Sequence, residues 1–137
     1  MALRIFDIAG SGMNAQNLRL NLVASNISNA NSAASSAAEV YKSRQPVFAA
    51  ELDKAMNTQN ATSKVNVLGV IESQDAPVME YAPHHPMANS DGYIFKSNVN
   101  TVEEMANMMS ASRSYQNNIE VLNTAKQMML QTLKMGQ

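Results

Sequence analysis

The C-terminal part of the chain contains the stretch that decides the fold, TVEEMANMMSASRSYQNNIEVLNTAKQMMLQTLKM, residues 101–135. Side chains recur through it at spacings of three and four, the period of one helix face. The positions are Met105, Met108, Ser112, Tyr115, Ile119, Leu122, Lys126, Met129 and Leu133, and all but Ser112 and Lys126 are apolar or aromatic. Thr101 and Glu104 fit a capping box at its start, and Gly136 stands where the helix would end. The stretch predicts a long amphipathic helix that needs a partner.

The partner is expected at the other end of the chain, where residues 3–27 also have helical spacing. Apolar side chains recur every seven residues, and a second row is broken by Gln16. The positions are Phe6, Met13, Leu20 and Ile27, with Ala9 and Val23 in the second row. A further stripe on another flank, of Ala15, Leu18 and Leu22, indicates more than one neighbour. We expect the two terminal helices to pair as an antiparallel, coiled-coil-like hairpin with the middle of the chain inserted.

The middle of the chain predicts a small β-rich module, so that the fold class is α+β. Residues 64–72 alternate, which places Val65, Val67, Gly69 and Ile71 on one face of a strand, and residues 78–82 and 93–96 are further strand candidates. Asp91 and Gly92 predict a turn.

The segments around these strands are less regular. Residues 33–38 and 53–63 are expected to be flexible, and residues 40–50 to be extended and to lead into a short helical turn, with Pro46 opposing a long central strand. The sequence thus divides into an N-terminal helix with its asparagine-rich end (1–36), the β-rich module (37–97) and a C-terminal helix (98–137).

Composition narrows the classes of function. The formal net charge is −1 and only 15% of residues are charged, which argues against nucleic acid and anionic membranes as partners. Arg4 and Asp7 interrupt the apolar start, so no secretory signal is expected, and no stretch is apolar enough for a membrane span. The chain has no cysteine and hence no thiolate chemistry.

Catalytic motifs are also missing from the sequence. The adjacent pair His84 and His85 could in principle bind a metal, as in a metal-dependent hydrolase. Neighbouring side chains on an extended backbone point to opposite faces, and prolines flank the pair, so a stiff loop is the preferred interpretation. No G-x-S-x-G elbow or phosphate-binding loop occurs. We therefore expect no enzyme, no metal and no cofactor.

Residues 18–32, LRLNLVASNISNANS, combine apolar side chains with uncharged hydrogen-bonding ones, and no charge occurs at residues 20–38. Two interpretations are open. The segment could be an ordinary asparagine-rich helix end and loop. Alternatively, it faces neighbouring subunits, where an unpaired buried charge would be costly and asparagine and serine can instead satisfy turns and bond across the contact.

Residues 6–32, FDIAGSGMNAQNLRLNLVASNISNANS, resemble the N-terminal signature of bacterial flagellar rod, hook and related axial proteins, in which a helix ends in N-[IL]-x-N-x-[NT]. Asn26, Asn29 and Asn31 occupy its asparagine positions. Residues 98–137 are similar to the closing helix of that family. The middle resembles its small proximal-rod members through Gly69, Ile71, Pro77, Tyr81, Pro83, His85, Pro86, Ala88, Gly92, Tyr93, Asn98, Val99 and Asn100. Residues 32–39, SAASSAAE, depart from the glycine- or proline-containing loop that is common in the family.

The resemblance implies a structural subunit of the flagellar basal-body proximal rod, the drive shaft that transmits torque to the hook. It implies polymerisation through the terminal helices, with copies of itself and other rod proteins (FlgB, FlgF, FlgG and FliE-like) as partners. It further implies export by the flagellar type III apparatus to the periplasm without a cleaved signal peptide. The alternative is a soluble helical adaptor or export-chaperone-like protein that binds one partner with the same apolar stripes.

Overall fold

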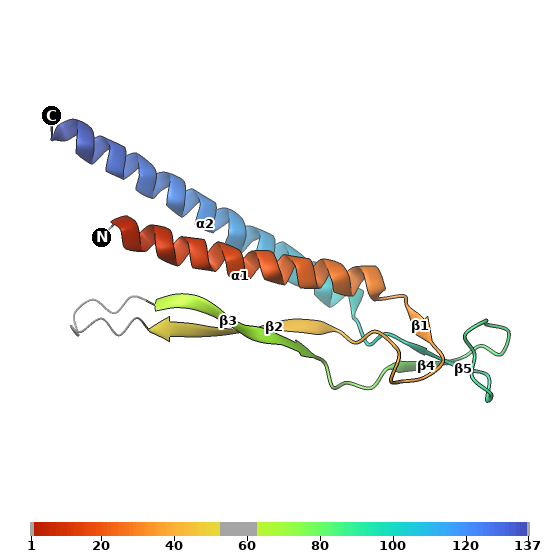
Figure 1. Cartoon of the computed structure of the whole chain (residues 1–137). Coiled ribbons are helices and arrows are strands. Elements are labelled where there is room, and N and C mark those ends of the chain that lie inside the picture. Colours follow the sequence, from red (N-terminus) through yellow and green to blue (C-terminus); the bar gives the residue numbers. More distant parts are fainter. Residues whose placement is uncertain (1, 53–62, 137) are drawn as a thin grey trace.

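The two terminal helices form the spine of the molecule. In a computed structural model that describes residues 2–52 and 63–136, α1 (Ala2–Asn29) and α2 (Thr101–Met135) lie side by side and antiparallel (Figure 1). Five strands lie between them in the sequence: β1 (Ala33–Ala34), β2 (Arg44–Leu52), β3 (Ser63–Glu72), β4 (Val78–Tyr81) and β5 (Tyr93–Lys96). This arrangement confirms the predicted α+β class and the helical hairpin.

β2 and β3 form a two-stranded antiparallel ribbon that packs along α1 (Figure 1). The extended segment predicted at residues 40–50 is found largely as β2, which continues to Leu52 in place of the helical turn expected at its end. Pro46 is accommodated because both strands of such a ribbon are edge strands. Val67 pairs with Phe48 but Gly69 pairs with Val47, so Leu68 is an extra residue in a β-bulge. The predicted face is found only in part, because Val67 and Gly69 are half-buried whereas Val65 and Ile71 are exposed.

The second sheet has the strand order β1-β5-β4 and is antiparallel throughout. β1 corrects the expectation of a flexible segment at residues 33–38, because Ala34 is buried and pairs with Phe95. The predicted turn is present: Gly92 has a φ of 81°, and a Cβ there would lie 2.9 Å from the Tyr81 ring. The loop predicted at residues 53–63 falls, except for Ser63, outside the described residues.

The start of α2 differs from the predicted capping box by one residue. Asn100, not Thr101, is the N-cap: its Oδ1 accepts hydrogen bonds from the backbone N–H groups of Val102 (3.1 Å) and Glu103 (3.4 Å). Glu104 is thereby placed beyond the capping position and turns into the interior, where it is 4% exposed.

Alanine dominates the buried apolar side chains. In the described part of the chain they are Ala9, Ala15, Val23, Ala30, Ala34, Val40, Ile94, Ala111 and Ala125. Small side chains let the two helices approach closely but each removes little apolar surface from water, at roughly 25 cal/mol per Å². The isolated chain therefore has a thin core for its length.

Candidate subunit interface

A buried asparagine joins three elements at one end of the helix pair. Asn26 of α1 is 1% exposed. Its Nδ2 donates to the Arg44 carbonyl (2.9 Å) and to Glu104 Oε2 (3.2 Å), and its Oδ1 accepts from Tyr41 Oη (2.8 Å) and from the Arg44 N–H (3.0 Å). Because both ends of the amide are satisfied, one side chain ties α1 to the start of α2 and to β2. We call this set of contacts the Asn26 hub.

Further hydrogen bonds close the same end of the molecule. The Ser43 N–H donates to Asn98 Oδ1 (2.8 Å), and the Ser97 N–H donates to the Ser32 carbonyl (3.3 Å). These bonds connect the segment after α1 to the segment before α2. The Asn26 hub and these two bonds together define the closed end of the molecule.

The other asparagines of the motif have different roles. Asn29 is half-buried and donates to the Ser25 carbonyl of its own helix (2.9 Å), whereas Asn31 is exposed. The bonds of Asn26 and Asn29 are thus made within the chain. Only Asn31 presents its side chain to the surroundings.

The opposite end of the helix pair is open. α2 extends past the start of α1 (Figure 1), and its last turns expose Leu133 (67% exposed) and Met135 (83% exposed) together with Met129 and Leu130. We call residues 129–135 the free end of α2. Its apolar side chains are exposed, least at Met129 (36%) and most at Met135 (83%), which is typical of a surface that binds another protein.

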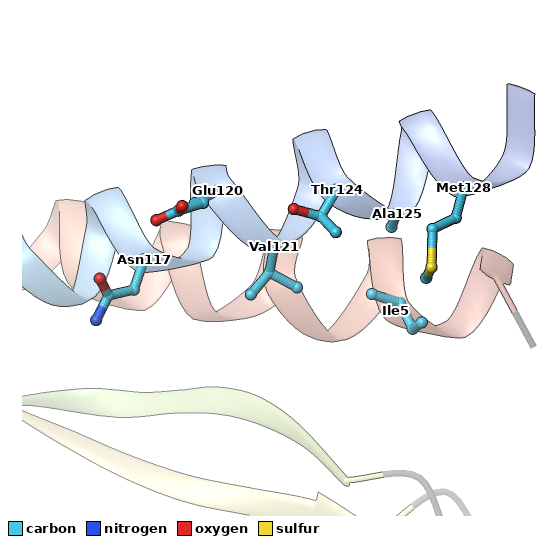
Figure 2. A pocket seen from close by; sticks show the side chains of 7 residues that line it. All are labelled: Ile5, Asn117, Glu120, Val121, Thr124, Ala125 and Met128. Atoms are coloured by element: carbon cyan, nitrogen blue, oxygen red, sulfur yellow. The ribbon is translucent and has the colours of Figure 1, made fainter. Parts of the chain in front are cut away.

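An apolar groove of about 470 Å³ lies next to the free end, between α1 and α2. Figure 2 shows Met128 pointing from α2 toward the part of α1 that carries Ile5. Val121 lies two helical turns before Met128 on α2. Asn117, Glu120, Thr124 and Ala125 complete the lining. The groove and the free end form one continuous apolar region on the helix pair.

The structure separates the predicted interface residues into two groups. On α1, Val23 is buried and the remaining predicted residues, Phe6, Met13, Leu20 and Ile27, are half-buried. On α2, Met108, Tyr115 and Leu122 are half-buried, whereas Met105, Ile119, Met129 and Leu133 are exposed. The centre of the seam between the helices is instead occupied by Ala111, Ala125 and Glu104. The predicted stripes therefore flank this centre.

Sequence reasoning missed two features of the surface. Glu104 was assigned to a cap, although its contact is with Asn26, because no local pattern reveals a partner 78 residues away. Leu68, 67% exposed at the bulge, and its neighbours Val70 and Ile71 form a second exposed apolar strip on β3. A strand that breaks its alternation cannot be assigned an outer face from sequence alone.

The histidine pair lies in an exposed loop between β4 and β5. His85 Nδ1 accepts a hydrogen bond from the Met87 N–H (3.1 Å), a local contact that shapes the loop. Over residues 2–52 and 63–136, no three histidine, cysteine or acidic side chains come together in a way that could hold a metal ion. Within the same ranges, neither helix combines the length and the apolar character needed to cross a bilayer.

Comparison with known proteins identifies relatives over the full length. Residues 6–38 match the family model "Flagella basal body rod protein", and residues 90–135 match "Flagellar basal body rod FlgEFG protein C-terminal". The chain is 51% identical to the flagellar basal-body rod protein FlgC of Salmonella typhimurium over 98% of both chains. It is 50% identical to the FlgC protein of Escherichia coli O157:H7 and 43% identical to that of Yersinia enterocolitica, again over 98% of both chains.

Proposed function

Because this chain belongs to the flagellar basal-body rod protein family and is a structural subunit of that rod, we propose that it joins neighbouring subunits through the open end of its helix pair. The observation that carries the proposal is the free end of α2, which leaves Leu133 and Met135 exposed beyond the start of α1. Covering one such side chain is worth roughly 1.5–3 kcal/mol. Apolar side chains that are exposed in a single chain can thus be buried once neighbouring subunits are present, and this burial stabilises the assembled state.

The proposed interface also includes the predicted stripes on both helices. We assign to it Phe6, Met13, Leu20, Val23 and Ile27 of α1, and Met105, Met108, Tyr115, Ile119, Leu122, Met129 and Leu133 of α2. The exposed members, Met105, Ile119, Met129 and Leu133, would contact neighbours first, and the half-buried ones would pack from within the seam. In this proposal residues 1–36 and 98–137 build the axial core, and residues 37–97 form the β-rich module that packs against it.

The partners we propose are copies of the same chain and the rod proteins FlgB, FlgF, FlgG and FliE-like subunits. The position is the proximal rod across the periplasm, where the assembled subunits would transmit torque from motor to hook.

Delivery would use the flagellar type III export apparatus without a cleaved signal peptide, and no membrane insertion, nucleic acid, metal or cofactor is involved. A thin core and the absence of cysteine in the sequence are compatible with export in an unfolded state. The family's role is structural, and we propose no catalytic activity.

The test is the substitution Leu133→Asp in the native gene, with Gln131→Asp as the matched control. Both positions are exposed on the last turns of α2 and both changes add one negative charge. We expect Leu133→Asp to abolish motility and rod incorporation, because it places an unpaired charge in the contact. The unfolding free energy of the purified chain should change by less than about 0.5 kcal/mol.

Gln131→Asp should retain motility and incorporation. Normal rod incorporation of Leu133→Asp, scored by the amount of the chain in purified basal bodies, would reject the proposed interface. Equal loss in both variants would point to a general effect of charge at this end.

A further inference from the structure

Two contacts across the seam, one a hydrogen bond and one a close approach to a glycine, are separated by the same number of residues on both helices. Asn26 bonds to Glu104, and a Cβ added to Gly12 would lie 3.0 Å from Asn118 Nδ2, so Gly12 and Asn118 are also opposite each other. Residues 12 and 26 are two heptads apart, and so are residues 104 and 118. Both contacts therefore belong to one antiparallel alignment of α1 and α2.

The seam holds one further polar bond between the helices, from Arg19 Nη2 to Asn107 Oδ1 (2.9 Å), and its remaining positions discriminate poorly between alignments. Alanine and methionine occupy many of its positions, and methionine adapts to different surroundings. A slip of one heptad in one direction would place Asn26 opposite Ala111 and Asn118 opposite Arg19. Such a slip would remove the Glu104 carboxylate from the Asn26 amide, which leaves two buried polar groups without this bond. It would also place Ala125 instead of Asn118 beside Gly12.

The alignment also determines how far α2 projects. In the observed alignment Ile5 lies beside Ala125, and residues 129–135 extend past α1. The slip just described would bring Ile5 opposite Thr132 and cover the free end, whereas the opposite slip would lengthen it by a heptad. A buried polar pair that specifies register in a helical seam is a known use of such groups.

We propose that Asn26–Glu104 and Gly12–Asn118 set the register of the helix pair and thereby fix the length of the free end of α2. The register itself is independent of assembly, while its consequence for neighbouring subunits rests on the proposed function. β1–β5 pairing and the Arg19–Asn107 bond are the competing determinants, because the first links the end of α1 to the start of α2 and the second joins the two helices directly.

The experiment measures register directly in the dilute, purified chain. The sequence has no cysteine, so an introduced pair can be cross-linked unambiguously with a short bis-maleimide. Ile5→Cys with Ala125→Cys reports the observed alignment, and Ile5→Cys with Thr132→Cys reports the slip. Each pair is placed in the native background and in an Asn26→Leu, Glu104→Leu background, with far-ultraviolet circular dichroism to confirm helix content.

We expect only the 5–125 pair to cross-link in the native background. In the Leu–Leu background, cross-linking of the 5–132 pair should rise at least tenfold while helix content is retained. If the Leu–Leu chain does not fold, Glu104→Leu alone is used, because it leaves the bonds from Asn26 to Tyr41 and Arg44 in place. Glu104→Gln, which can still accept the bond from Asn26, should keep the native pattern.

Exclusive 5–125 cross-linking in the leucine variants would overturn the proposal and assign the register to β1–β5 pairing or the Arg19–Asn107 bond. Loss of helix in Glu104→Leu would also overturn it, since a register determinant predicts that the helices pair in another alignment. These readings do not depend on rod assembly, so failure here is distinguishable from failure of the Leu133→Asp test.

Discussion

The two ends of the helix pair are built on opposite principles. The closed end is polar and complete: the amide of Asn26 makes hydrogen bonds to Tyr41, Arg44 and Glu104, and short strands connect the segments around it. The open end is apolar and incomplete, with exposed leucine and methionine on the last turns of α2. The comparison teaches that one helix pair can complete its polar contacts at one end and leave apolar side chains exposed at the other.

The largest expected contrast is in local stability. Backbone amides of residues 104–111 lie at the closed end, and those of residues 129–135 lie on the free end, where little surrounds the helix. We expect hydrogen exchange in the free end to be close to unprotected and exchange near the Asn26 hub to approach the global unfolding free energy, on the order of 5 kcal/mol. Exchange measured by mass spectrometry on the dilute chain tests this, and equal protection at both ends would remove the contrast.

Removing the Asn26 amide should be the most damaging single substitution at the closed end. Asn26→Ala leaves the Tyr41 hydroxyl, the Arg44 N–H and the Glu104 carboxylate without this partner inside the protein. We expect the unfolding free energy to fall by about 2–4 kcal/mol in urea denaturation. Asn31→Ala, at an exposed position of the same motif, is the control and should be neutral.

A smaller loss is expected from Gly92→Ala in the β4–β5 turn. A φ of 81° is unfavourable for alanine, and the new Cβ would meet the Tyr81 ring. The unfolding free energy should fall by about 1–3 kcal/mol. Gly10→Ala is the matched control, because a Cβ there meets nothing within 4 Å and alanine favours helix, so it should be neutral or stabilise by up to roughly 1 kcal/mol. An unchanged unfolding free energy in Gly92→Ala would show that the turn contributes little to the stability of the closed end.

The smallest effect is expected at the histidine pair, which belongs to neither end of the seam. His84→Ala combined with His85→Ala removes one local contact to the Met87 N–H in an exposed loop. Motility should be unchanged, and stability should change by less than about 0.5 kcal/mol. Loss of motility in a chain of normal stability would reveal a role for this loop that is independent of both ends of the helix pair.

Periodic features of the structure could be predicted from the sequence, whereas long-range polar contacts could not. Heptad spacing identified α1 and α2, and alternation with a glycine turn identified β3, β4 and β5. The sequence predicts Thr101 as the N-cap of α2, whereas the structure has Asn100. Both residue types can cap a helix, and local sequence does not fix a helix boundary to within one residue.

The centre of the helical seam was also misjudged for a physical reason. Pattern counting gives weight to large apolar residues, but close approach of two helices favours alanine at the innermost positions, as at Ala111 and Ala125. The partner of Glu104 is in α1 and could be found only by knowing the alignment of the helices. The bulge at Leu68 interrupts the alternation from which strand faces are read.

The bond between Asn26 and Glu104 closes a loop of 78 residues, and this has a consequence for the order in which the protein acquires its structure. A ribosome delivers α1 first, yet the carboxylate that completes its buried amide emerges only after three quarters of the chain has been made. Contacts of such high sequence separation form slowly, because the chain entropy of closure is lost before the contact is gained. The helix pair therefore cannot close until translation is nearly finished, an interval in which a factor that holds unfolded polypeptide can engage the exposed face of α1.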